Sequence, residues 1–199
     1  MQASSRMDSD QLTRIKWFGI VTMTIDHIGA ILFPHVYIFR IIGRLALPCF
    51  LMGVYEGTHR TRHYSKYVLR MLGLGVLSIP VTSQTLNVMF LLVLFSLSVR
   101  HKQLFIPTLI ASYSVEYGAY GFLLGRAIVW MRERNKTEGT MFGILLTLLS
   151  GNPFQILSGL LLPFLTFDWR VHIPKGPKAF FYLYYPLHQL VLQIIANYL

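Results

Sequence analysis

Long apolar blocks dominate this chain, and its basic residues fall in every second gap between the blocks. Residues 18–33 and 88–99 are typical blocks, and one Asp and one His are the only ionisable residues in the two together. Only 13% of all residues are charged, whereas soluble domains carry about a quarter. A helix that crosses a bilayer needs roughly 20 mostly apolar residues. We therefore predict an all-α fold, a polytopic transmembrane helix bundle of about nine spans that forms one domain over residues 1–199.

The basic residues also predict on which side of the membrane each gap lies. The predicted spans cover residues 12–33, 36–57, 67–81, 86–99, 104–113, 117–131, 141–149, 154–167 and 179–199. Of the 18 Lys and Arg residues, all but Arg40, Arg44 and Arg126 lie near the start of the chain or in and beside alternate gaps. Because basic gaps favour the cytoplasmic side, we predict a cytoplasmic N-terminus, an external C-terminus and a multi-pass protein of the inner or plasma membrane.

Three features argue against other classes of protein. The formal net charge is +10, but the basic residues form no stripe interleaved with aromatic residues, so we expect no nucleic-acid binding. The single cysteine, Cys49, lies in an apolar block and provides neither an internal disulfide nor a metal cluster. Residues 1–12 are polar and lack a signal-peptide pattern, so the first span is expected to stay uncleaved.

Ionisable side chains inside the predicted spans are the strongest candidate functional residues, because a charge in the bilayer interior costs several kcal/mol. Asp26 and His27 lie deep in the first span, Arg40 and Arg44 in the second, and His188 in the last. Such residues normally face a polar interior or a substrate path, so each is a candidate for a functional role.

The spacing of Lys16 and His27 indicates a long ligand with two chemically different ends. At about 100° and 1.5 Å per residue, eleven residues place both side chains on one helix face, about 16 Å apart. A cationic group at the cytoplasmic boundary and an imidazole far below it suit coenzyme A, which has anionic phosphates at one end and a thioester at the other. Imidazole is also a suitable general base near neutral pH.

Asp26 and the two arginines admit two interpretations. Arg40 and Arg44 are four residues apart on one helix face, which suits an anion such as a phosphate or a developing oxyanion. Alternatively, Asp26 pairs with one of these arginines simply to neutralise the buried charges. Asp26 and His27 point about 100° apart on a helix, so they are not expected to face one another.

Other charged residues lie near the ends of the predicted spans. Glu56, Arg60 and Arg62 are either loop and head-group residues or part of a phosphate site. Arg126 and Glu116 are expected either to pair across the bundle or to lie near the membrane interfaces. The sequence does not decide between these alternatives.

Four segments together resemble the TraX family of multi-pass membrane acetyltransferases, known for acetylating the N-terminus of conjugative pilin. The segments are IKWFGIVTMTIDHIGAILFP, RIIGRLALPCF, YEGTHRTR and FFYLYYPLHQLVL. The resemblance covers both ends of the chain and most of the first ninety residues, but not residues 100–150.

The family is similar in turn to a wider group of transmembrane acyltransferases. That group carries an Arg or Lys, ten intervening residues and a His on its first helix, and Lys16 and His27 match this spacing. It also carries two arginines separated by two residues, whereas three residues separate Arg40 from Arg44 here. The resemblance implies acyl-CoA bound from the cytoplasm and acyl transfer towards the far side.

The leading hypothesis is acetyl transfer from cytoplasmic acetyl-CoA to an amine or hydroxyl at the outer side, on a pilin N-terminus or a surface glycan. The candidate residues are His27, Asp26 and Arg44 for catalysis, Lys16, Arg40, Arg60 and Arg62 for the cofactor, and Glu56, Tyr184, Tyr185 and His188 for the acceptor. No metal is expected. For the two tyrosines, an aromatic belt at the membrane interface is the alternative interpretation.

A small-molecule transporter or lipid flippase that uses the same charges is the alternative function. Membrane lipids and a protein or glycan acceptor are the other expected partners. The identity of the acceptor, the length of the acyl group, N- or O-acylation and the oligomeric state, including a homo-oligomer, are left open by the sequence.

Overall fold

All regular elements in the described part of the chain are helices. The structure is a computed structural model that describes residues 7–82, 85–167, 171 and 173–198. The α-helices are α1 (Ser9–Ile31), α2 (Tyr37–Gly43), α3 (Ala46–Arg60), α4 (Tyr64–Leu77), α5 (Val88–Arg100), α6 (Phe105–Ser112), α7 (Gly118–Glu133), α8 (Lys136–Leu149), α9 (Ile156–Leu160) and α10 (Lys178–Ala196). The short 3₁₀ helices are η1 (Ile79–Val81), η2 (Lys102–Leu104), η3 (Pro153–Gln155) and η4 (Leu162–Thr166). The predicted all-α fold is confirmed, and each of the nine predicted apolar stretches corresponds to a helical segment.

Polar side chains set the starts of several helices. Asp8 caps α1 by accepting hydrogen bonds from the backbone N–H groups of Ser9 and Asp10. Asn87 and Asn135 cap α5 and α8 in the same way. These bonds satisfy N–H groups that the first helical turn leaves without partners, so short polar breaks between apolar runs are enough to define where the helices begin.

The second apolar stretch is a broken helix, and Pro48 explains the break. Proline has no N–H, so the carbonyl of Arg44, four residues earlier, loses its normal helical partner. The hydroxyl of Ser158, in α9, donates to that carbonyl instead, at 3.1 Å. Pro48 therefore accounts for a kink, which lies between the end of α2 and the start of α3.

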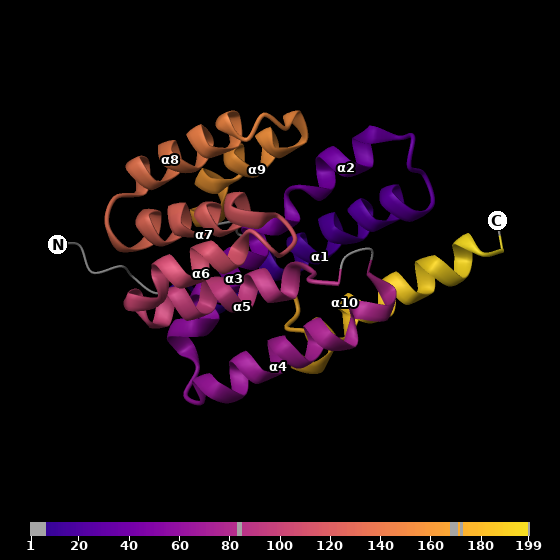
Figure 1. The fold of residues 1–199 in the computed structure, drawn as a ribbon, viewed down its shortest axis with the longest axis horizontal. Coiled ribbons are helices and arrows are strands. Elements are labelled where there is room, and N and C mark those ends of the chain that lie inside the picture. Colours follow the sequence, from indigo (N-terminus) through magenta and orange to yellow (C-terminus); the bar gives the residue numbers. More distant parts are fainter. Residues whose placement is uncertain (1–6, 83–84, 168–170, 172, 199) are drawn as a thin grey trace.

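The helices form a bundle with α3, α5 and α7 at its centre. Figure 1 shows α8, α7, α6, α5 and α4 side by side in this order, and each packs against the next. The central helices contribute fully buried side chains, among them Leu51, Phe95 and Phe122. The first helix, α1, packs against α2, α3 and α10, so the two ends of the sequence meet along this helix.

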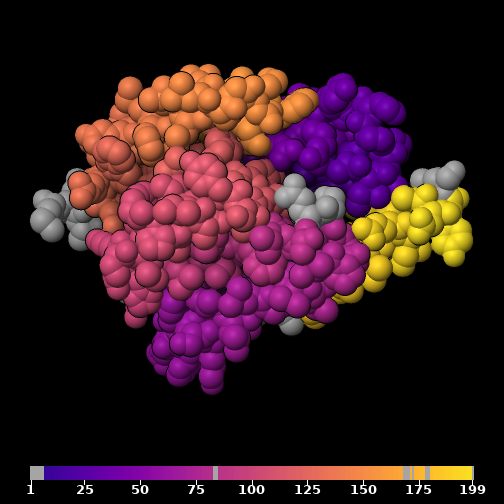
Figure 2. Space-filling model, in the orientation of Figure 1, coloured from indigo at the N-terminus to yellow at the C-terminus, as the bar shows by residue number. Residues whose placement is uncertain are grey.

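Large apolar side chains remain exposed on the outer helices α4, α6, α8 and α10, which Figure 2 shows at the surface of the bundle. They include Leu69, Val76, Leu77, Ile106, Ile110, Met141, Leu145, Leu148, Leu187, Val191 and Ile194. Exposed apolar area this extensive is unusual for a soluble monomer and typical of surfaces that contact other apolar material.

Helix length limits how many of the segments cross a bilayer in full. In the described part of the chain, residues 37–60 are the one helical stretch that is long and apolar enough to span a membrane by length and composition. Helices Val88–Arg100 and Pro153–Thr166 are apolar but shorter. The eight residues of α6 extend about 12 Å, less than half of a hydrocarbon core of about 30 Å. Helix length therefore does not support nine full crossings.

The loops that carry basic residues gather at the end of the bundle where α1 begins. The contacts that join them are Arg60 to the carbonyl of Met7, Lys175 to Asp10 (3.0 Å), Arg132 to Glu56 (3.1 Å) and Arg100 to the ring of Tyr64 (5.7 Å). Two further basic residues used in the prediction of sidedness, Arg6 and Arg170, lie outside the described residues. We call this end the basic end.

Segments without Lys or Arg meet at the other end of α1. There the backbone N–H of Glu116 donates to the carbonyl of Leu86 at 2.8 Å, and the rings of Tyr37 and Phe154 stack at 5.9 Å. Residues 32–36, 78–82, 113–117 and 150–155 contain no Lys or Arg. Residues 83 and 84, in one of these gaps, lie outside the described residues.

Candidate functional site

Two histidines from the opposite ends of the sequence meet where α1 packs against α10. Nδ1 of His27 lies 2.6 Å from Nε2 of His188, although 161 residues separate the two positions. On its other side, Nδ1 of His188 lies 2.6 Å from the backbone carbonyl of Tyr184. Only 8% of His188 is exposed. The structure therefore joins two candidates that the sequence had placed in separate spans.

The two predicted tyrosines of α10 flank this histidine pair. The ring of Tyr184 stacks on His188, with centroids 4.8 Å apart and an interplanar angle of 7°. Its hydroxyl lies 2.8 Å from that of Thr24 on α1. Tyr185 is buried and its ring centroid is 6.4 Å from that of His27. Both tyrosines thus pack against α1, which an aromatic belt facing the membrane interface would not require.

Lys16 lies on the same side of α1 as His27. Its ammonium group is 5.8 Å from the ring centroid of Phe181 in the first turns of α10, and His27 contacts the same helix seven residues further on. Because α1 is continuous over both positions, the helical spacing of about 16 Å holds. The geometric prediction for Lys16 and His27 is confirmed, with Lys16 nearer the basic end.

Asp26 faces α2 rather than His27. Its Oδ2 accepts a hydrogen bond from Nη1 of Arg40 at 2.8 Å, and the residue is 7% exposed. Gly43 permits this approach, because a Cβ at that position would lie 2.2 Å from the Cβ of Asp26. The pair with Arg40 agrees with the neutralising one of the two interpretations, and the divergence of Asp26 from His27 is as predicted. Oδ1 of Asp26 is buried, and no described residue provides a hydrogen bond to it.

Arg44 differs from Arg40 in that no described carboxylate lies within ion-pair distance of it, although it is close enough to Asp26 and Glu116 to interact electrostatically with both. Its Nη1 donates to the hydroxyl of Tyr117 at 3.0 Å, and its guanidinium carbon lies 5.4 Å from the centroid of that ring. Tyr117 is the one non-glycine residue with positive φ in the described chain, at 64°. A bulky residue in this region is strained, and such strain concentrates at functional sites.

A cavity of about 30 Å³ lies beside His27. Its polar lining comes from Asp26, His27, Glu116, Tyr117 and Tyr185. Ordinary ligand pockets enclose about 300–1,000 Å³, so this space accommodates reacting atoms but not a molecule the size of coenzyme A.

Sequence reasoning missed two residues of this cavity, Glu116 and Tyr117. The carboxylate of Glu116 accepts a hydrogen bond from the backbone N–H of Val88 at the start of α5 (2.9 Å), and burial raises the pKa of this carboxyl. Of the two alternatives for Glu116 and Arg126, the structure does not show the pair, because Arg126 lies over the ring of Phe105 at 5.3 Å. The sequence did offer one signal for Glu116, which is the one charged residue in the gap at residues 112–117.

The remaining predicted site residues lie at the basic end. Glu56 is 3% exposed and accepts hydrogen bonds from Arg60 at 2.8 Å and Arg132 at 3.1 Å. Arg60 also bonds the carbonyl of Met7. Met7 is 20 residues before His27, which corresponds to about 30 Å along the axis of α1. The structure thus separates Glu56 from Tyr184, Tyr185 and His188, with which it was grouped. Arg62 is exposed at the same end.

A comparison with protein families matches residues 11–196 to the family described as TraX protein. The chain belongs to the TraX family. The matched residues include both His27 and His188, so the site described above lies within the part of the chain that matches the family. The resemblance inferred from the four sequence segments is confirmed.

Two relatives of this TraX chain show how far the similarity extends. One is a probable fimbrial assembly protein FimC, serogroup H1, from Dichelobacter nodosus, 27% identical over 90% of this chain and 93% of its own length. The other is an uncharacterized protein RP591 from Rickettsia prowazekii (strain Madrid E), 51% identical over 41 residues, which are 20% of this chain and 16% of that protein. No solved structure matches this TraX chain.

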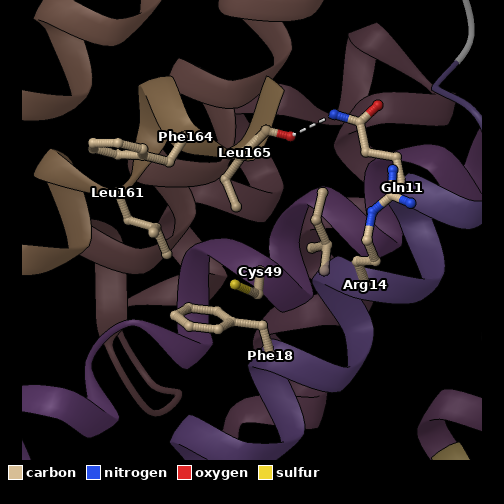
Figure 3. A pocket seen from close by; sticks show the side chains of 8 residues that line it. Gln11, Arg14, Phe18, Cys49, Leu161, Phe164 and Leu165 are labelled. Atoms are coloured by element: carbon tan, nitrogen blue, oxygen red, sulfur yellow. Dashed lines mark hydrogen bonds between the residues drawn. The ribbon is translucent and has the colours of Figure 1, made fainter. Parts of the chain in front are cut away.

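A second cavity of about 30 Å³ lies on the opposite face of α1 (Figure 3). Phe18, Cys49 and Leu161 form part of its apolar wall, and Gln11 bonds the carbonyl of Leu165 at its rim. Residues 18 and 27 are two and a half helical turns apart, so their side chains point to opposite sides of α1. This cavity therefore does not open onto the histidine pair. Its residues provide no nucleophile or base in contact with His27.

The arrangement of this TraX site suits proton transfer beside an anion. It offers an imidazole, a carboxylate paired with Arg40, and the guanidinium of Arg44 without a carboxylate partner among the described residues. Within those residues, no group of three or more His, Cys, Asp or Glu side chains is arranged to hold a metal ion. A base next to a cation is the combination used where a proton leaves and negative charge develops.

Proposed function

We propose that this TraX chain is a membrane-embedded acetyltransferase that moves an acetyl group from cytoplasmic acetyl-CoA to an amine or hydroxyl at the outer side. The observation that carries the proposal is the position of His27. It is a hydrogen-bonded imidazole in a largely apolar helix, about 16 Å from Lys16 on the same helix side. That separation suits the long arm of coenzyme A, with its phosphates at the basic end and its thioester at the histidine.

The distribution of charge supports a multi-pass membrane location with the N-terminus inside. The basic loops contact one another at one end of the bundle, as expected if they share the cytoplasmic side. Exposed apolar residues on α4, α6, α8 and α10 would contact lipid. The shorter helices, α6 among them, would cross only part of the bilayer, where other helices cover their ends.

In the proposed reaction, His27 accepts the proton of the acceptor amine or hydroxyl. The acceptor atom then bonds to the acetyl carbon, negative charge develops on the thioester oxygen, and Arg44 stabilises it. The carbon–sulfur bond breaks, and the sulfur takes the proton back from His27 to leave as free coenzyme A. Arg40 holds Asp26 and so stabilises the junction of α1 and α2. Lys16 and Arg62 would contact the phosphates of the nucleotide.

The acceptor is proposed to be a surface protein, with a pilin-type N-terminal amine as the first choice. The name of the Dichelobacter nodosus relative refers to fimbrial assembly, and that relative matches nearly the whole chain. A surface glycan remains the second choice because its hydroxyl would use the same base. The cavity beside His27 is small enough that either acceptor would enter as a single protruding group.

The first experiment measures acetyl-CoA binding and slow release of the coenzyme A thiol by the purified protein in detergent. With water as the acceptor, wild type should bind acetyl-CoA and release thiol and acetate. The His27→Ala variant should bind with similar affinity and release thiol about 10²–10⁴ times more slowly, since this is the usual contribution of a general base. His35→Ala, at an exposed position between α1 and α2, is the matched control and should behave like wild type.

Two results would overturn the proposal. If folded wild type and variant both fail to bind acetyl-CoA, the charges serve another function, and transport of a small molecule or lipid becomes the leading hypothesis. If His27→Ala releases thiol as fast as wild type, the enzyme class survives but His27 is not its base.

A further inference from the structure

We propose that His188 is a positioning residue that holds the proton of His27 on Nδ1, which leaves Nε2 of His27 as the atom that accepts the proton of the acceptor. The assignment of the tautomer depends only on hydrogen-bond geometry. Its consequence for rate rests on the proposed acetyltransferase function. This role would explain why His188 is buried beside His27, although His188 takes no direct part in the proposed reaction.

The argument begins with the carbonyl of Tyr184. A carbonyl oxygen only accepts hydrogen bonds, so Nδ1 of His188, 2.6 Å away, must be the donor. A neutral imidazole carries one proton, so Nε2 of His188 is then an acceptor. Nδ1 of His27, 2.6 Å from that Nε2, must therefore carry a proton and donate it.

The consequence for His27 follows from the same rule. With its proton on Nδ1, neutral His27 has a lone pair on Nε2, and no described residue forms a hydrogen bond to that atom. If His27 gains a second proton, Nδ1 still donates to His188, so the bond between the two rings persists through a proton-transfer cycle. Nδ1 of His27 thus orients the ring through its bond to His188, and Nε2 remains available to accept a proton. A catalytic histidine needs both functions.

The opposite arrangement is costly at this site. It would require His188 to donate from both nitrogens, which makes it a buried imidazolium with 8% exposure. A buried charge is tolerated when it is paired, and no described carboxylate pairs with His188. Steric packing also holds its ring, because Tyr184 stacks on it in nearly parallel planes.

A second polar link fixes the register of α1 against α10. The hydroxyl of Thr24 donates to the carbonyl of Ile20 at 2.8 Å, so the hydroxyl of Tyr184, 2.8 Å from Thr24, must donate to it. Thr24 and His27 are three residues apart, and Tyr184 and His188 are four apart, so each pair shares one helix face. Two links at successive turns hold the rings in place more firmly than one bond alone.

The first test reads the tautomer directly. Protein labelled with ¹⁵N-histidine is studied in detergent by long-range ¹H–¹⁵N correlation, which distinguishes a protonated ring nitrogen from an unprotonated one. The His27→Ala variant assigns the signals. Wild-type His27 should show a protonated Nδ1 and an unprotonated Nε2, and His188→Phe should lose this fixed pattern. A protonated Nε2 in neutral wild-type His27 would overturn the proposal, whether or not the protein proves to be an acetyltransferase.

The second test uses two replacements of His188. His188→Gln keeps a carbonyl oxygen near the position of Nε2 and can still accept from His27, whereas His188→Phe keeps the ring and its stacking on Tyr184 but accepts nothing. We expect His188→Phe to lower kcat for acetyl transfer or thiol release by about 10²–10⁴, as for loss of a correctly oriented base, with KM for acetyl-CoA little changed. His188→Gln should recover most of this loss.

His59→Gln is the matched control. His59 also bonds through Nδ1 to the carbonyl four residues earlier, that of Tyr55, at 2.9 Å, but it contacts no second histidine. Its replacement should leave kcat unchanged. An equal loss of kcat in His188→Gln and His188→Phe, both folded, would show that only the bulk of the ring matters and would overturn the positioning role. Absence of activity in wild type would refute the enzyme, while the tautomer would still be decided by the spectrum.

Discussion

Replacing Gly43 with Ala should damage the junction between α1 and α2. The added Cβ would lie 2.2 Å from both Cβ and Oδ1 of Asp26 and 2.4 Å from its Cγ. Carbon atoms in contact normally sit about 3.5–4.0 Å apart, so the two helices must separate by more than about 1 Å. That movement lengthens the 2.8 Å ion pair between Asp26 and Arg40.

The magnitude follows from two effects at the same place. Overpacking a close helix contact costs about 1–3 kcal/mol, and breaking a buried ion pair costs about 3–5 kcal/mol. Moving the helices apart relieves the overpacking but weakens the ion pair, so the two costs are not simply added. We therefore expect a total destabilisation of about 3 kcal/mol. For a protein of this size, that corresponds to a fall of about 6–12 °C in the unfolding midpoint.

The assay is thermal unfolding of the purified protein in one detergent, with Gly53→Ala as the control. Gly53 lies inside α3, and a Cβ there would meet nothing within 4 Å. Alanine is favoured over glycine inside a helix by about 0.5–1 kcal/mol, so the control should unfold at the same temperature or slightly higher. If Gly43→Ala unfolds with wild type and the control, the close approach of Asp26 to α2 does not exist in the folded protein.

Two other predictions test the basic end and its orientation. Glu56→Gln should destabilise the protein by about 3–5 kcal/mol, because the buried carboxylate that pairs with Arg60 and Arg132 loses its charge. Exposed Glu138→Gln should change the midpoint little, and equal effects of the two changes in thermal unfolding would contradict the buried pairing. Cysteines introduced by Arg62→Cys and His35→Cys should react with a membrane-impermeant maleimide from opposite sides of sealed vesicles. The native Cys49 is 1% exposed and should not react. Labelling of both introduced cysteines from one side would refute the proposed topology.

Much of the fold could be predicted because helix formation depends on local sequence. Apolar runs between polar caps define the helices, and Pro48 breaks its helix for a reason internal to the chain, the missing N–H. The common orientation of Lys16 and His27, and the divergence of Asp26 from His27, follow from 3.6 residues per turn. These features required no knowledge of which helix packs against which.

The composition of the site could not be predicted in the same way. Whether His27 meets His188, and whether Glu116 meets Arg126 or the start of α5, depends on which distant helices become neighbours. Sequence periodicity gives the face that a helix presents but not the helix that covers it. The sequence therefore left the partner of Glu116 undecided, and the structure places its carboxylate at the start of α5.

The sequence alone therefore determined the helical class, the positions of the basic loops and the face of α1 that carries Lys16 and His27, because all three are set by residues close together in the chain. Only the tertiary structure decided the rest. It brought His188 to His27 across 161 residues, left Arg44 without a described carboxylate partner, and buried Glu56 at the far end of the bundle. Those outcomes depend on the packing of α10, α2 and α3 against α1 and of α7 against α3, which is an energetic property of the whole bundle rather than of any one segment.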